Sequence, residues 1–404
     1  MTISNSVAII GQGYVGLPLA LSACKSGWRV YGIEIDANRR ELLANGKSPI
    51  EGITDAELGI QLEKGSYSPT SDFELIRKCA FVVICVPTPL DDNGKPDLTP
   101  LITTAQKLAP NLSDGAVVIN ESTSYPGTLK EIIQAEVLKI STAKNIGFAV
   151  SPERVDPGNK SFEQSNTPRI VSGVDQESLN SAANFYRTFC SQVVEVASPE
   201  IAEMAKLLEN SFRLVNISMI NEISDFCLRL GIDVYDVIAA AKTKPFGFMP
   251  FYPSLGIGGH CIPIDPIYLL ERAKKYEVKL ETIRIAKDVD KRRVERIANE
   301  IFARLGKTRE VTVVGLGYKP GTRDTRESAS VRLIIALRNL GVIVNWLDSF
   351  VEEWRGEHSA KDICQNAILV WEDPQFFPQG FLDGGGVLFD LTGKLRNING
   401  VISL

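Results

Sequence analysis

The sequence lacks any apolar run close to the roughly 20 residues that a helix needs to cross a lipid bilayer. Its first residues lead from Met1 into the apolar run 7–10, with no charged leader before a cleavable apolar stretch. These absences argue against a membrane-spanning helix and against export. We therefore expect a cytoplasmic protein with no membrane partner.

Histidine and paired cysteine are also scarce. The chain has two histidines, and its seven cysteines are scattered with no CxxC pair among them. An odd and scattered set of cysteines predicts neither a disulfide framework nor a zinc site. We expect reduced thiols and no bound metal.

Positive charge is not in excess, since 44 lysines and arginines stand against 49 aspartates and glutamates. The net charge of −5 argues against a nucleic-acid partner but leaves open a local basic pocket for a small anion. The sequence has no internal repeat, and its 404 residues exceed what one hydrophobic core serves. The composition predicts a globular chain of two or three domains.

Short segments rich in valine and isoleucine alternate with amphipathic stretches in the N-terminal part of the chain. They lie at residues 7–10, 30–35, 81–86, 117–120, 148–151 and 170–172. This alternation predicts a parallel sheet with helices on both faces. The same alternation returns near the C-terminus, at residues 311–315, 341–347, 367–370 and 386–390.

The middle of the chain is helical in character. A cap and a proline at residues 198–199 open a helical pattern that runs to about Leu230. Residues 244–266 interrupt later helical sequence with glycine, proline and aromatic residues, which suggests a functional site. The long helix carries more apolar residues than one domain can cover, so we predict a homodimer through it. These residues are Leu207, Leu208, Phe212, Val215, Ile217 and Ile220.

A glycine-rich turn, GQGYVG at residues 11–16, follows the first predicted strand and opens a helical pattern. Glycines at this spacing let the backbone approach a pyrophosphate at a helix N-terminus. The next strand ends at Glu34, where a carboxylate accepts hydrogen bonds from ribose hydroxyls and repels a 2′-phosphate. The turn therefore predicts a Rossmann-like domain that prefers NAD to NADP, and the alternative is a tight turn without cofactor.

Polar residues follow two later strands. Thr88 comes after the apolar run 81–86, and the triplet EST at residues 121–123 comes after the run 117–120. Ligands of parallel sheets bind beyond the C-terminal ends of the strands, so these residues are placed to line the nicotinamide side. Ordinary loop polarity is an equal alternative.

The most unusual segment is GIGGHCIPID at residues 256–265. Glycine amides crowded around Cys261 would stabilise a thiolate, and Asp265 follows four residues later. We interpret Cys261 as a candidate nucleophile, with an inert buried thiol as the alternative. His260 has no partner ligands for a metal, so we expect it to shape the loop.

Other polar residues have ordinary explanations as well. Lys206 and Asn210 stand four residues apart and share a helix face with Arg213, which surface solvation would also explain. Arg154 and Asp156 follow a predicted strand end, where they would face a ligand or form a salt bridge within the loop.

These segments together make the sequence resemble the UDP-glucose/GDP-mannose dehydrogenase family over essentially its whole length. The resemblance rests on GQGYVGLP at 11–18, ICVPTP at 84–89, EST at 121–123, SPER at 151–154, the helix with Lys206 and Asn210, GGHCIPID at 258–265 and GYKPGTRDTRES at 317–328. It implies an NAD-dependent enzyme of α/β class, with two Rossmann-like doubly wound parallel-sheet domains joined by a helical central domain. We predict these domains at residues 1–197, 198–303 and 304–404, with the UDP-sugar bound by the last and lying between domains.

The resemblance also implies the site residues. The predicted catalytic residues are Cys261, Lys206, Asn210, Asp265, Thr123 and Glu153. The predicted cofactor-binding residues are Gly11, Gly13, Tyr14, Val15, Gly16, Glu34, Arg39, Thr88, Thr123 and Arg326. The predicted substrate-binding residues are Glu153, Arg154, Val155, Lys206, Asn210, Arg213, Phe251, Tyr252, Gly258 and Lys319.

The implied chemistry explains these residue types. An aldehyde has no hydride to give until a nucleophile adds to it, so a second oxidation needs a thiohemiacetal, which becomes a thioester that water opens. Asp265 with an ordered water, or Lys206, would take the alcohol proton in the first oxidation. Lys206 and Asn210 would hold the developing oxyanion. Thr123 and Glu153 would position or activate the hydrolytic water.

Two departures from the family pattern bear on the substrate. UDP-glucose dehydrogenases commonly have a lysine before the aspartate of the cysteine loop and a serine before the cysteine, where this sequence has Ile264 and His260. Together with the segments 151–159 and 245–261, this looks more like the branch that acts on UDP-N-acetylhexosamines. We predict four-electron oxidation of the C6 hydroxymethyl of UDP-N-acetylglucosamine to the uronic acid, for polysaccharide precursor synthesis.

The alternatives fall into two groups. UDP-N-acetylmannosamine and UDP-glucose are alternative substrates for the same chemistry. A non-catalytic nucleotide-sugar binding protein and a single-step hydroxyacid dehydrogenase are alternative functions, and the latter would have no use for Cys261.

Overall fold

The computed structural model describes residues 5–154, 165–305 and 309–404 of the chain. These residues form two compact units, and each is described by itself. Unit 1 comprises the described part of residues 1–209 together with residues 267–276, and unit 2 comprises residues 210–266 and the described part of residues 277–404. The finer division at residues 197/198 and 303/304 stays a prediction.

Unit 1 is built on an eight-stranded sheet with the strand order β3-β2-β1-β4-β5-β6-β7-β8. Its strands are β1 (Ser6–Ile10), β2 (Arg29–Ile33), β3 (Tyr67–Thr70), β4 (Phe81–Ile84), β5 (Val117–Asn120), β6 (Gly147–Val150), β7 (Arg169–Gly173) and β8 (Val193–Glu195). Neighbouring strands pair in parallel, as the alternation predicts, except that β7 runs antiparallel to β6. The strand order reverses at β1, and sheets of this kind bind ligands beyond the strand C-termini at such a point.

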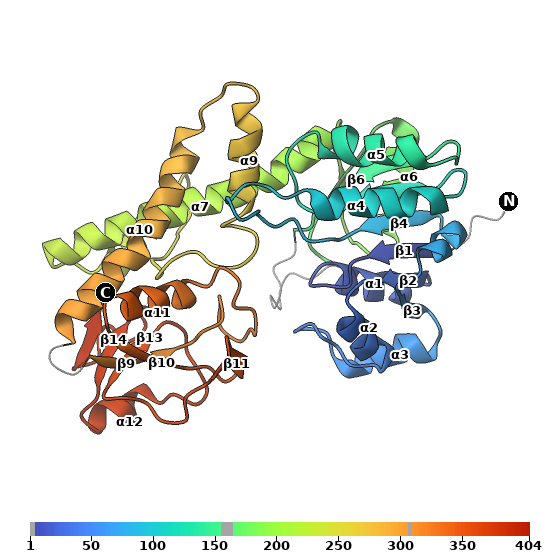
Figure 1. Cartoon of the computed structure of the whole chain (residues 1–404). Helices are drawn as coiled ribbons and strands as arrows, with labels where there is room; N and C mark the ends of the chain where they lie inside the picture. The colour runs from blue at the N-terminus through green and yellow to red at the C-terminus, as the bar shows by residue number, and fades with distance from the viewer. Residues whose placement is uncertain (1–4, 155–164, 306–308) are drawn as a thin grey trace. The chain divides into compact units, whose positions relative to one another are not determined.

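Helices cover both faces of this sheet (Figure 1). Val7 and Ile9 of β1 pack into one core and Ala8 and Ile10 into the other, because side chains alternate across a strand. The first core takes side chains from α1 (Gly16–Lys25), α3 (Asp55–Glu63) and α6 (Gln176–Arg187). The second takes side chains from α4 (Thr99–Leu108), η3 (Leu129–Gln134) and α5 (Ala135–Ile140). Burial on both faces accounts for the continuous apolar runs in the sequence.

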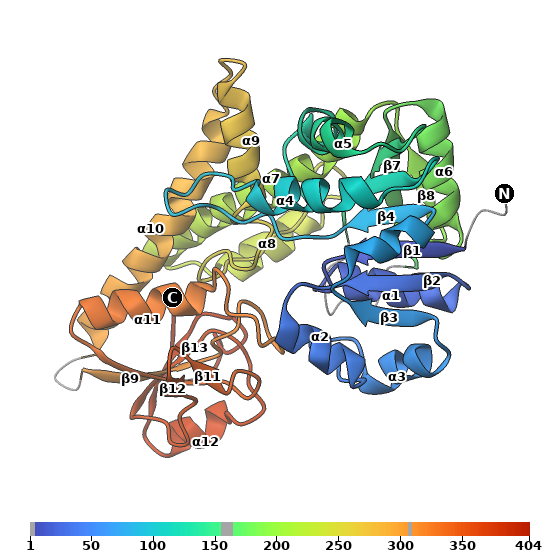
Figure 2. The same ribbon diagram turned by 45° about the vertical axis from the view of Figure 1, so that its right-hand side comes forward.

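Unit 2 contains a second parallel sheet, with the strand order β10-β9-β13-β14-β15 (Figure 2). Its strands are β9 (Glu310–Val314), β10 (Ile343–Leu347), β13 (Asn366–Leu369), β14 (Val387–Asp390) and β15 (Val401–Ser403). Helices α10 (Glu281–Arg304) and α11 (Ala329–Asn339) pack on one face, and α12 (Pro378–Asp383) packs on the other. The predicted α/β class with two parallel sheets and a helical middle is confirmed.

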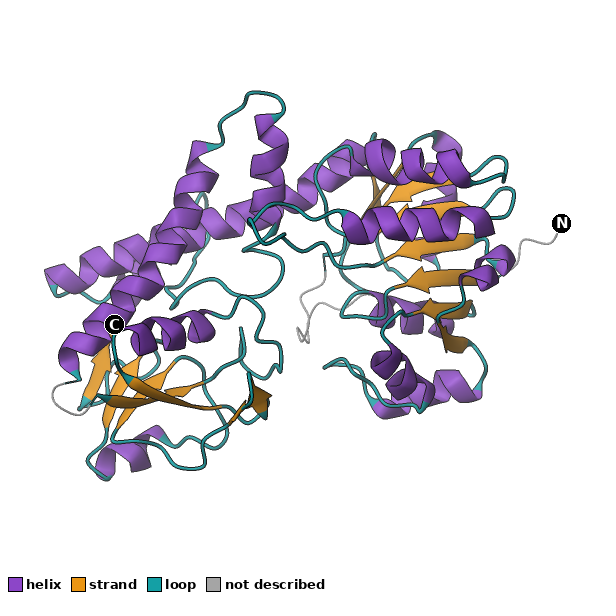
Figure 3. Cartoon of the chain, in the orientation of Figure 1, coloured by secondary structure: helices purple, strands orange, loops and turns teal. Residues whose placement is uncertain are grey.

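Two helices contribute residues to both units. They are α7 (Pro199–Leu230) and α9 (Asp265–Lys274). Between α8 (Val234–Lys242) and α9, residues 243–264 form neither helix nor strand, as the glycine and proline content predicts (Figure 3). The predicted cysteine loop therefore leads directly into α9.

Helix α7 carries a row of exposed apolar side chains. The row consists of Ile201, Met204, Leu208, Phe212, Met219, Ile223, Phe226 and Leu230. Their spacing follows the helical period, so they share one side of the helix. Of the residues that the sequence predicted for an interface, Leu208 and Phe212 belong to this row, whereas Leu207 and Ile220 are buried within the chain. None of the described helices, α7 included, is long and apolar enough to span a bilayer.

Candidate active site

The glycine-rich turn joins β1 to α1, and its contacts exclude side chains at two positions. Gly11 has a φ of +91°, and a Cβ there would lie 2.4 Å from the carbonyl oxygen of Cys85. A Cβ at Gly16 would lie 1.8 Å from the carbonyl oxygen of Gly11. At Gly13 a Cβ would meet nothing within 4 Å, so this side of the turn is open to a bound group. The turn thus has the form that a pyrophosphate requires.

Glu34 lies beside this turn, directly after β2, and its side chain is buried. Its carboxylate accepts hydrogen bonds from the backbone N–H groups of Gln12 (3.0 Å) and Asp36 (2.9 Å). It also forms an ion pair with Arg39, at 3.3 Å. A negative charge is therefore fixed next to the turn, where the ribose of a dinucleotide lies in this class of sheet.

Tyr14 and Val15 complete the turn. The hydroxyl of Tyr14 donates a hydrogen bond to Glu51 at 2.6 Å. Val15 occupies the N-cap position of α1, which has no side-chain cap and no acidic residue in its first turn. The helix N-terminus keeps its positive end toward the turn, which favours an anion there.

Thr88 and Thr123 follow β4 and β5, two strands that pair in parallel with each other. Since β4 also pairs with β1, the C-terminal ends of all three strands share one edge with the glycine turn. Thr88 is buried and Thr123 is half-buried. The hydroxyl of Ser122 donates to the carbonyl oxygen of Val86 at 2.7 Å, which ties the two strand ends together. The fold thus gathers the predicted cofactor residues of unit 1 along one sheet edge.

Glu153 and Arg154 follow the next strand, β6. Glu153 is buried and accepts from its neighbour's backbone N–H at 2.6 Å. Arg154 forms an ion pair with Glu209 of α7 at 2.7 Å and donates to the carbonyl oxygen of Pro168 at 2.7 Å. Val155 and Asp156, the other two residues predicted in this segment, lie outside the described residues.

The sequence analysis assigned no role to Arg169, the first residue of β7. Its guanidinium forms ion pairs with Glu121 at 2.7 Å and with Glu153 at 3.0 Å. All three side chains are buried. The available signal was an arginine that immediately precedes the apolar run 170–172, where a charge in a buried strand needs a partner.

Lys206 and Asn210 are both buried on α7, so surface solvation does not account for them. Surface solvation does account for Arg213, which is exposed. The side-chain amide of Asn210 donates to the carboxylate of Asp265 at 2.5 Å, within unit 2. Two of the predicted catalytic residues are therefore in direct contact.

Glu203, one helical turn before Lys206, anchors the start of α7 in unit 1. Its carboxylate accepts from the backbone N–H groups of Gly127 (2.6 Å) and Leu129 (2.9 Å), in the segment that follows Thr123. Burial raises the pKa of Glu203 to about 7, while the two N–H groups act in the opposite direction. The sequence analysis did not single out this residue.

Cys261 is exposed, alone among the seven cysteines, all of which lie in the described part of the chain. Its carbonyl oxygen accepts from the backbone N–H groups of Ile264 (3.1 Å) and Asp265 (2.8 Å). This turn directs the chain into α9. The alternative of an inert buried thiol does not describe Cys261.

The glycines before Cys261 serve close packing. A Cβ at Gly259 would lie 2.8 Å from the ring of Tyr318, and one at Gly258 would lie 3.0 Å from the same side chain. The backbone N–H of Gly259 donates to the carbonyl oxygen of Arg326 at 3.2 Å. This amide is therefore used in a backbone contact, and the expectation that glycine amides crowd around the sulfur of Cys261 stays a prediction.

A clamp from α10 and α11 fixes the same loop at Ile257. Asp290 of α10 accepts from the backbone N–H of Ile257 at 2.7 Å and pairs with Arg332 of α11 at 3.0 Å. Arg332 donates to the carbonyl oxygen of Ile257 at 2.8 Å. The N–H and the carbonyl oxygen of Ile257 are thus bound by Asp290 and Arg332, which also form an ion pair with each other.

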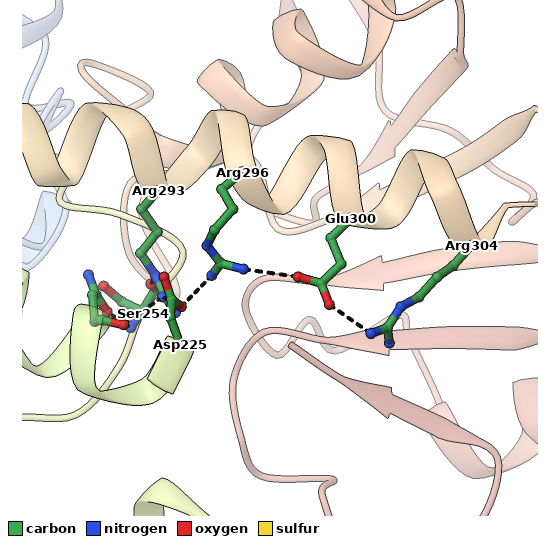
Figure 4. A network of polar contacts seen from close by, with 7 residues as sticks. Asp225, Ser254, Arg293, Arg296, Glu300 and Arg304 are labelled. Carbon is green, nitrogen blue, oxygen red and sulfur yellow. Dashed lines mark hydrogen bonds and ion pairs between the residues drawn. The ribbon is translucent and has the colours of Figure 1, made fainter. Parts of the chain in front are cut away.

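A second contact between α10 and the loop lies near Ser254 (Figure 4). Arg293 donates to the carbonyl oxygen of Ser254 at 2.5 Å and to Asp225 of α7 at 2.6 Å. Arg296 also pairs with Asp225, and Glu300 continues the network along α10. Helix α10 therefore holds the loop at two positions before Cys261, Ser254 and Ile257.

The remaining predicted ligands of unit 2 have aromatic or charged neighbours. The ring of Phe251 lies edge-on to Phe212, with centroids 5.7 Å apart, and Tyr252 stacks on Tyr235 at 6.2 Å. Arg326 forms an ion pair with Asp324 at 2.6 Å. Lys319 lies over the ring of Tyr318, at 5.5 Å.

His260 is half-buried in the loop. Loss of hydration, with the positive charge of Arg326, lowers its pKa, so the imidazole is neutral at pH 7. Within the described ranges, no group of three His, Cys, Asp or Glu side chains has the arrangement of a metal site.

Three models of one family match the chain in order. The NAD binding domain of the UDP-glucose/GDP-mannose dehydrogenase family matches residues 5–190, the central domain residues 200–292 and the UDP binding domain residues 312–373. The glycine turn and Glu34 supply the features that NAD requires, and both lie in the first of these ranges.

Individual relatives agree with this match. A UDP-N-acetyl-D-mannosamine dehydrogenase of Pyrococcus horikoshii is 33% identical over 92% of this chain and 90% of its own. A UDP-N-acetyl-D-glucosamine 6-dehydrogenase of Pseudomonas aeruginosa is 34% identical over 85% of this chain and 83% of its own. The solved structure of the UDP-D-ManNAc dehydrogenase from Pyrococcus horikoshii superposes with a TM-score of 0.87 at 29% identity, covering 98% of each chain. The chain therefore belongs to the UDP-glucose/GDP-mannose dehydrogenase family and is an NAD-dependent nucleotide-sugar dehydrogenase.

Proposed function

We propose that this enzyme oxidises the C6 hydroxymethyl group of a UDP-N-acetylhexosamine, with UDP-N-acetylglucosamine as the first candidate, to the uronic acid through a thioester on Cys261. The observation that carries the proposal is the exposed Cys261 at a fixed turn, four residues before a buried Asp265 that Asn210 holds at 2.5 Å. An exposed thiol four residues before a buried, hydrogen-bonded carboxylate suits nucleophilic catalysis with acid–base assistance.

The proposed reaction begins with the alcohol. Bound NAD accepts hydride in each of the two oxidations. Asp265 through a water, or Lys206, takes the hydroxyl proton as the C6 hydride leaves, and the product is an aldehyde. Asn210 and Lys206 stabilise the negative charge that develops on the C6 oxygen.

The second oxidation uses Cys261. Its sulfur adds to the aldehyde carbon, so a C–S bond forms and the carbonyl oxygen becomes the oxygen of a thiohemiacetal. Loss of the second hydride from this carbon and of the proton from the thiohemiacetal hydroxyl gives the thioester. Water then adds to the thioester carbon and the C–S bond breaks. One water proton goes to the sulfur, the other goes to solvent, and the carboxylate leaves. We assign the positioning or activation of this water to Thr123 and Glu153.

We assign the cofactor and the UDP part of the substrate to separate segments of the chain. Gly11, Gly13, Gly16 and Glu34 bind the cofactor, together with the other residues predicted for it. We assign the UDP part of the substrate to the segment that carries Lys319, within the span of the UDP binding domain model at residues 312–373.

The choice of an N-acetylhexosamine draws support from two sources. The relatives named above are specific, by name, for UDP-N-acetyl-D-mannosamine and UDP-N-acetyl-D-glucosamine. Ile264 and His260 also depart from the pattern of UDP-glucose dehydrogenases. UDP-N-acetylmannosamine is the second candidate, and we further propose that the product serves polysaccharide synthesis in the cytoplasm and that the enzyme is a homodimer through α7.

Parallel NADH progress curves with UDP-N-acetylglucosamine, UDP-N-acetylmannosamine and UDP-glucose test the proposal. We expect the highest kcat/KM with the first sugar, two NADH per sugar consumed, and no free aldehyde. A single NADH per sugar would favour a one-step dehydrogenase. Binding of the sugars without NADH formation would favour a non-catalytic binder.

A further inference from the structure

A buried charged cluster lies at the C-terminal edge of the unit 1 sheet, around Arg169. One guanidinium nitrogen contacts Glu121 at 2.7 Å, and the other contacts Glu153 at 3.0 Å. Tyr186 of α6 donates its hydroxyl to the same oxygen of Glu121 at 2.5 Å, and its ring lies 4.7 Å below the guanidinium. The three charged residues are 1 to 8% exposed, so solvent contributes little to their charge balance.

The antiparallel strand β7 explains how the arginine reaches this edge. Val150 pairs with Ser172 and Ala149 with Gly173. If this register is extended beyond the end of β6, Arg169 lies opposite Glu153. In a fully parallel sheet the first residue of a strand would lie at the opposite edge from the strand C-termini.

The cluster contains one cation and two carboxylates, so it carries an excess negative charge when all three groups are ionised. A buried carboxylate is costly unless it is paired, and here both draw on one guanidinium. Glu121 uses one oxygen for both of its contacts, and its other oxygen, Oε2, has no hydrogen-bond partner among the described residues. A proton on Oε2 therefore breaks neither contact.

Glu121 is the residue of this cluster whose protonation changes near neutral pH. Burial raises the pKa of Glu121 to about 7; Arg169 opposes this effect and Glu153 adds to it. Loss of hydration also raises the pKa of the thiols of Cys85 and Cys190, which face the cluster and stay neutral. Burial raises the pKa of Tyr186 as well.

We propose that Arg169 and Glu121 are positioning residues that hold the carboxylate of Glu153 in place and in its ionised form for thioester hydrolysis. The positive charge of Arg169 compensates the negative charge of Glu153. Ionised Glu121 competes with Glu153 for this guanidinium, and protonated Glu121 no longer does. The inference rests on the proposed function, in which Glu153 acts on the hydrolytic water.

The experiment measures hydrolysis by itself. The wild-type enzyme is mixed with substrate and NAD in a single turnover and quenched, and the sugar mass on the Cys261 peptide is followed between pH 5 and 9. Wild-type hydrolysis should change in rate near pH 7, where Glu121 ionises and begins to compete with Glu153 for the guanidinium. In Glu121→Gln the side chain at position 121 is neutral at every pH, so we expect this change near pH 7 to be absent.

Two further variants test the same arrangement. Tyr186→Phe keeps the ring under Arg169 but removes a donor to ionised Glu121, so we expect the change in rate to move from near pH 7 to a higher pH. Arg169→Met removes the cation, so the acid limb should shift upward and hydrolysis should slow at least tenfold. Circular dichroism and thermal melting identify variants that fold, and the two milder variants keep the test decisive if Arg169→Met does not.

The outcomes distinguish a failure of this inference from a failure of the proposed function on which it rests. A folded Glu121→Gln that keeps the wild-type change in rate near pH 7, or a folded Tyr186→Phe with that change at the wild-type pH, would overturn the inference alone, provided that Glu153→Gln accumulates the thioester. Glu153→Gln with wild-type hydrolysis would overturn the inference together with the assigned role of Glu153. Loss of the change near pH 7 in Glu121→Gln, with shifts of the expected signs in the other folded variants, supports the inference, because a purely structural role would lower stability without altering the pH profile.

Discussion

The side-chain amide of Asn210 donates a 2.5 Å hydrogen bond to the carboxylate of Asp265, and both side chains are buried. We expect Asn210→Ala to lower kcat about a hundredfold, because it removes a predicted donor to the developing oxyanion and releases the predicted base. Asn216→Ala is the matched control, since it truncates an amide on the same helix that donates to the carbonyl oxygen of Phe212 and has no predicted role in the site. Equal kcat values for the two variants would exclude this role of Asn210.

Replacement of Cys261 should separate the two oxidations. Cys261→Ala should lose NADH formation beyond the aldehyde stage, with a fall of at least about a thousandfold in two-step turnover, because no nucleophile converts the aldehyde into a hydride donor. Cys261→Ser should bind substrate nearly as well but turn over very slowly, since an alkoxide forms less readily than a thiolate and its ester resists hydrolysis. Stopped-flow NADH counts and the mass of the quenched peptide report both effects. Normal two-step turnover by Cys261→Ala would refute the thioester mechanism.

Cofactor choice should depend on Glu34. The wild-type enzyme should prefer NAD strongly to NADP, because the buried carboxylate beside the glycine turn repels a 2′-phosphate. Glu34→Ala should narrow the ratio of the two kcat/KM values by at least about tenfold, which corresponds to about 1.4 kcal/mol. Glu63→Ala, an exposed glutamate at the end of α3, controls for the loss of one negative charge. An unchanged ratio in Glu34→Ala would place Glu34 away from the ribose.

The contributions of Asp290 and Arg332, the two residues that clamp the cysteine loop, to stability should be coupled. Asp290→Asn keeps one acceptor but loses the charge that holds Arg332, so we expect a loss of about 1–3 kcal/mol in unfolding free energy and a lower kcat. Arg332→Met should act similarly, and the double variant should cost less than the sum because the two side chains hold each other. Urea titrations and steady-state rates measure both effects. Asp288→Asn, a half-exposed residue of the same helix, provides the control. Additive losses in the double variant would contradict the coupling.

The exposed apolar row of α7 should mediate self-association. Leu208 and Phe226 are each about three-fifths exposed, at 59% and 60%, in the isolated chain. We expect sedimentation of the wild-type enzyme at micromolar concentration to give a dimer, and Phe226→Glu to give a monomer, because an unpaired charge is costly in an apolar interface. Ile60→Glu places the same charge on an exposed apolar site of α3 and should leave the dimer intact. A wild-type monomer would count against the prediction.

The sequence by itself determined the features that depend on local order along the chain. The glycine turn at residues 11–16, the acidic end of the second strand at Glu34 and the apolar strand runs follow from near neighbours, since turn geometry and burial pattern are local. The long helix and the loop before Cys261 were predicted for the same reason, from a helical period and its interruption. Motif order then indicated the family, and the family models confirm it.

Tertiary structure alone decided which distant residues meet. Arg169 reaches Glu121 and Glu153 only because β7 enters the sheet antiparallel, and neither periodicity nor spacing encodes strand direction. Asp290 and Arg332 clamp Ile257 from helices whose own sequences look like ordinary charged surfaces. The glycines beside Cys261 proved to fit Tyr318, because a missing side chain in the sequence does not reveal which neighbour fills its space. Partner choice is a property of the packed fold, where burial makes an unpaired charge too costly to leave.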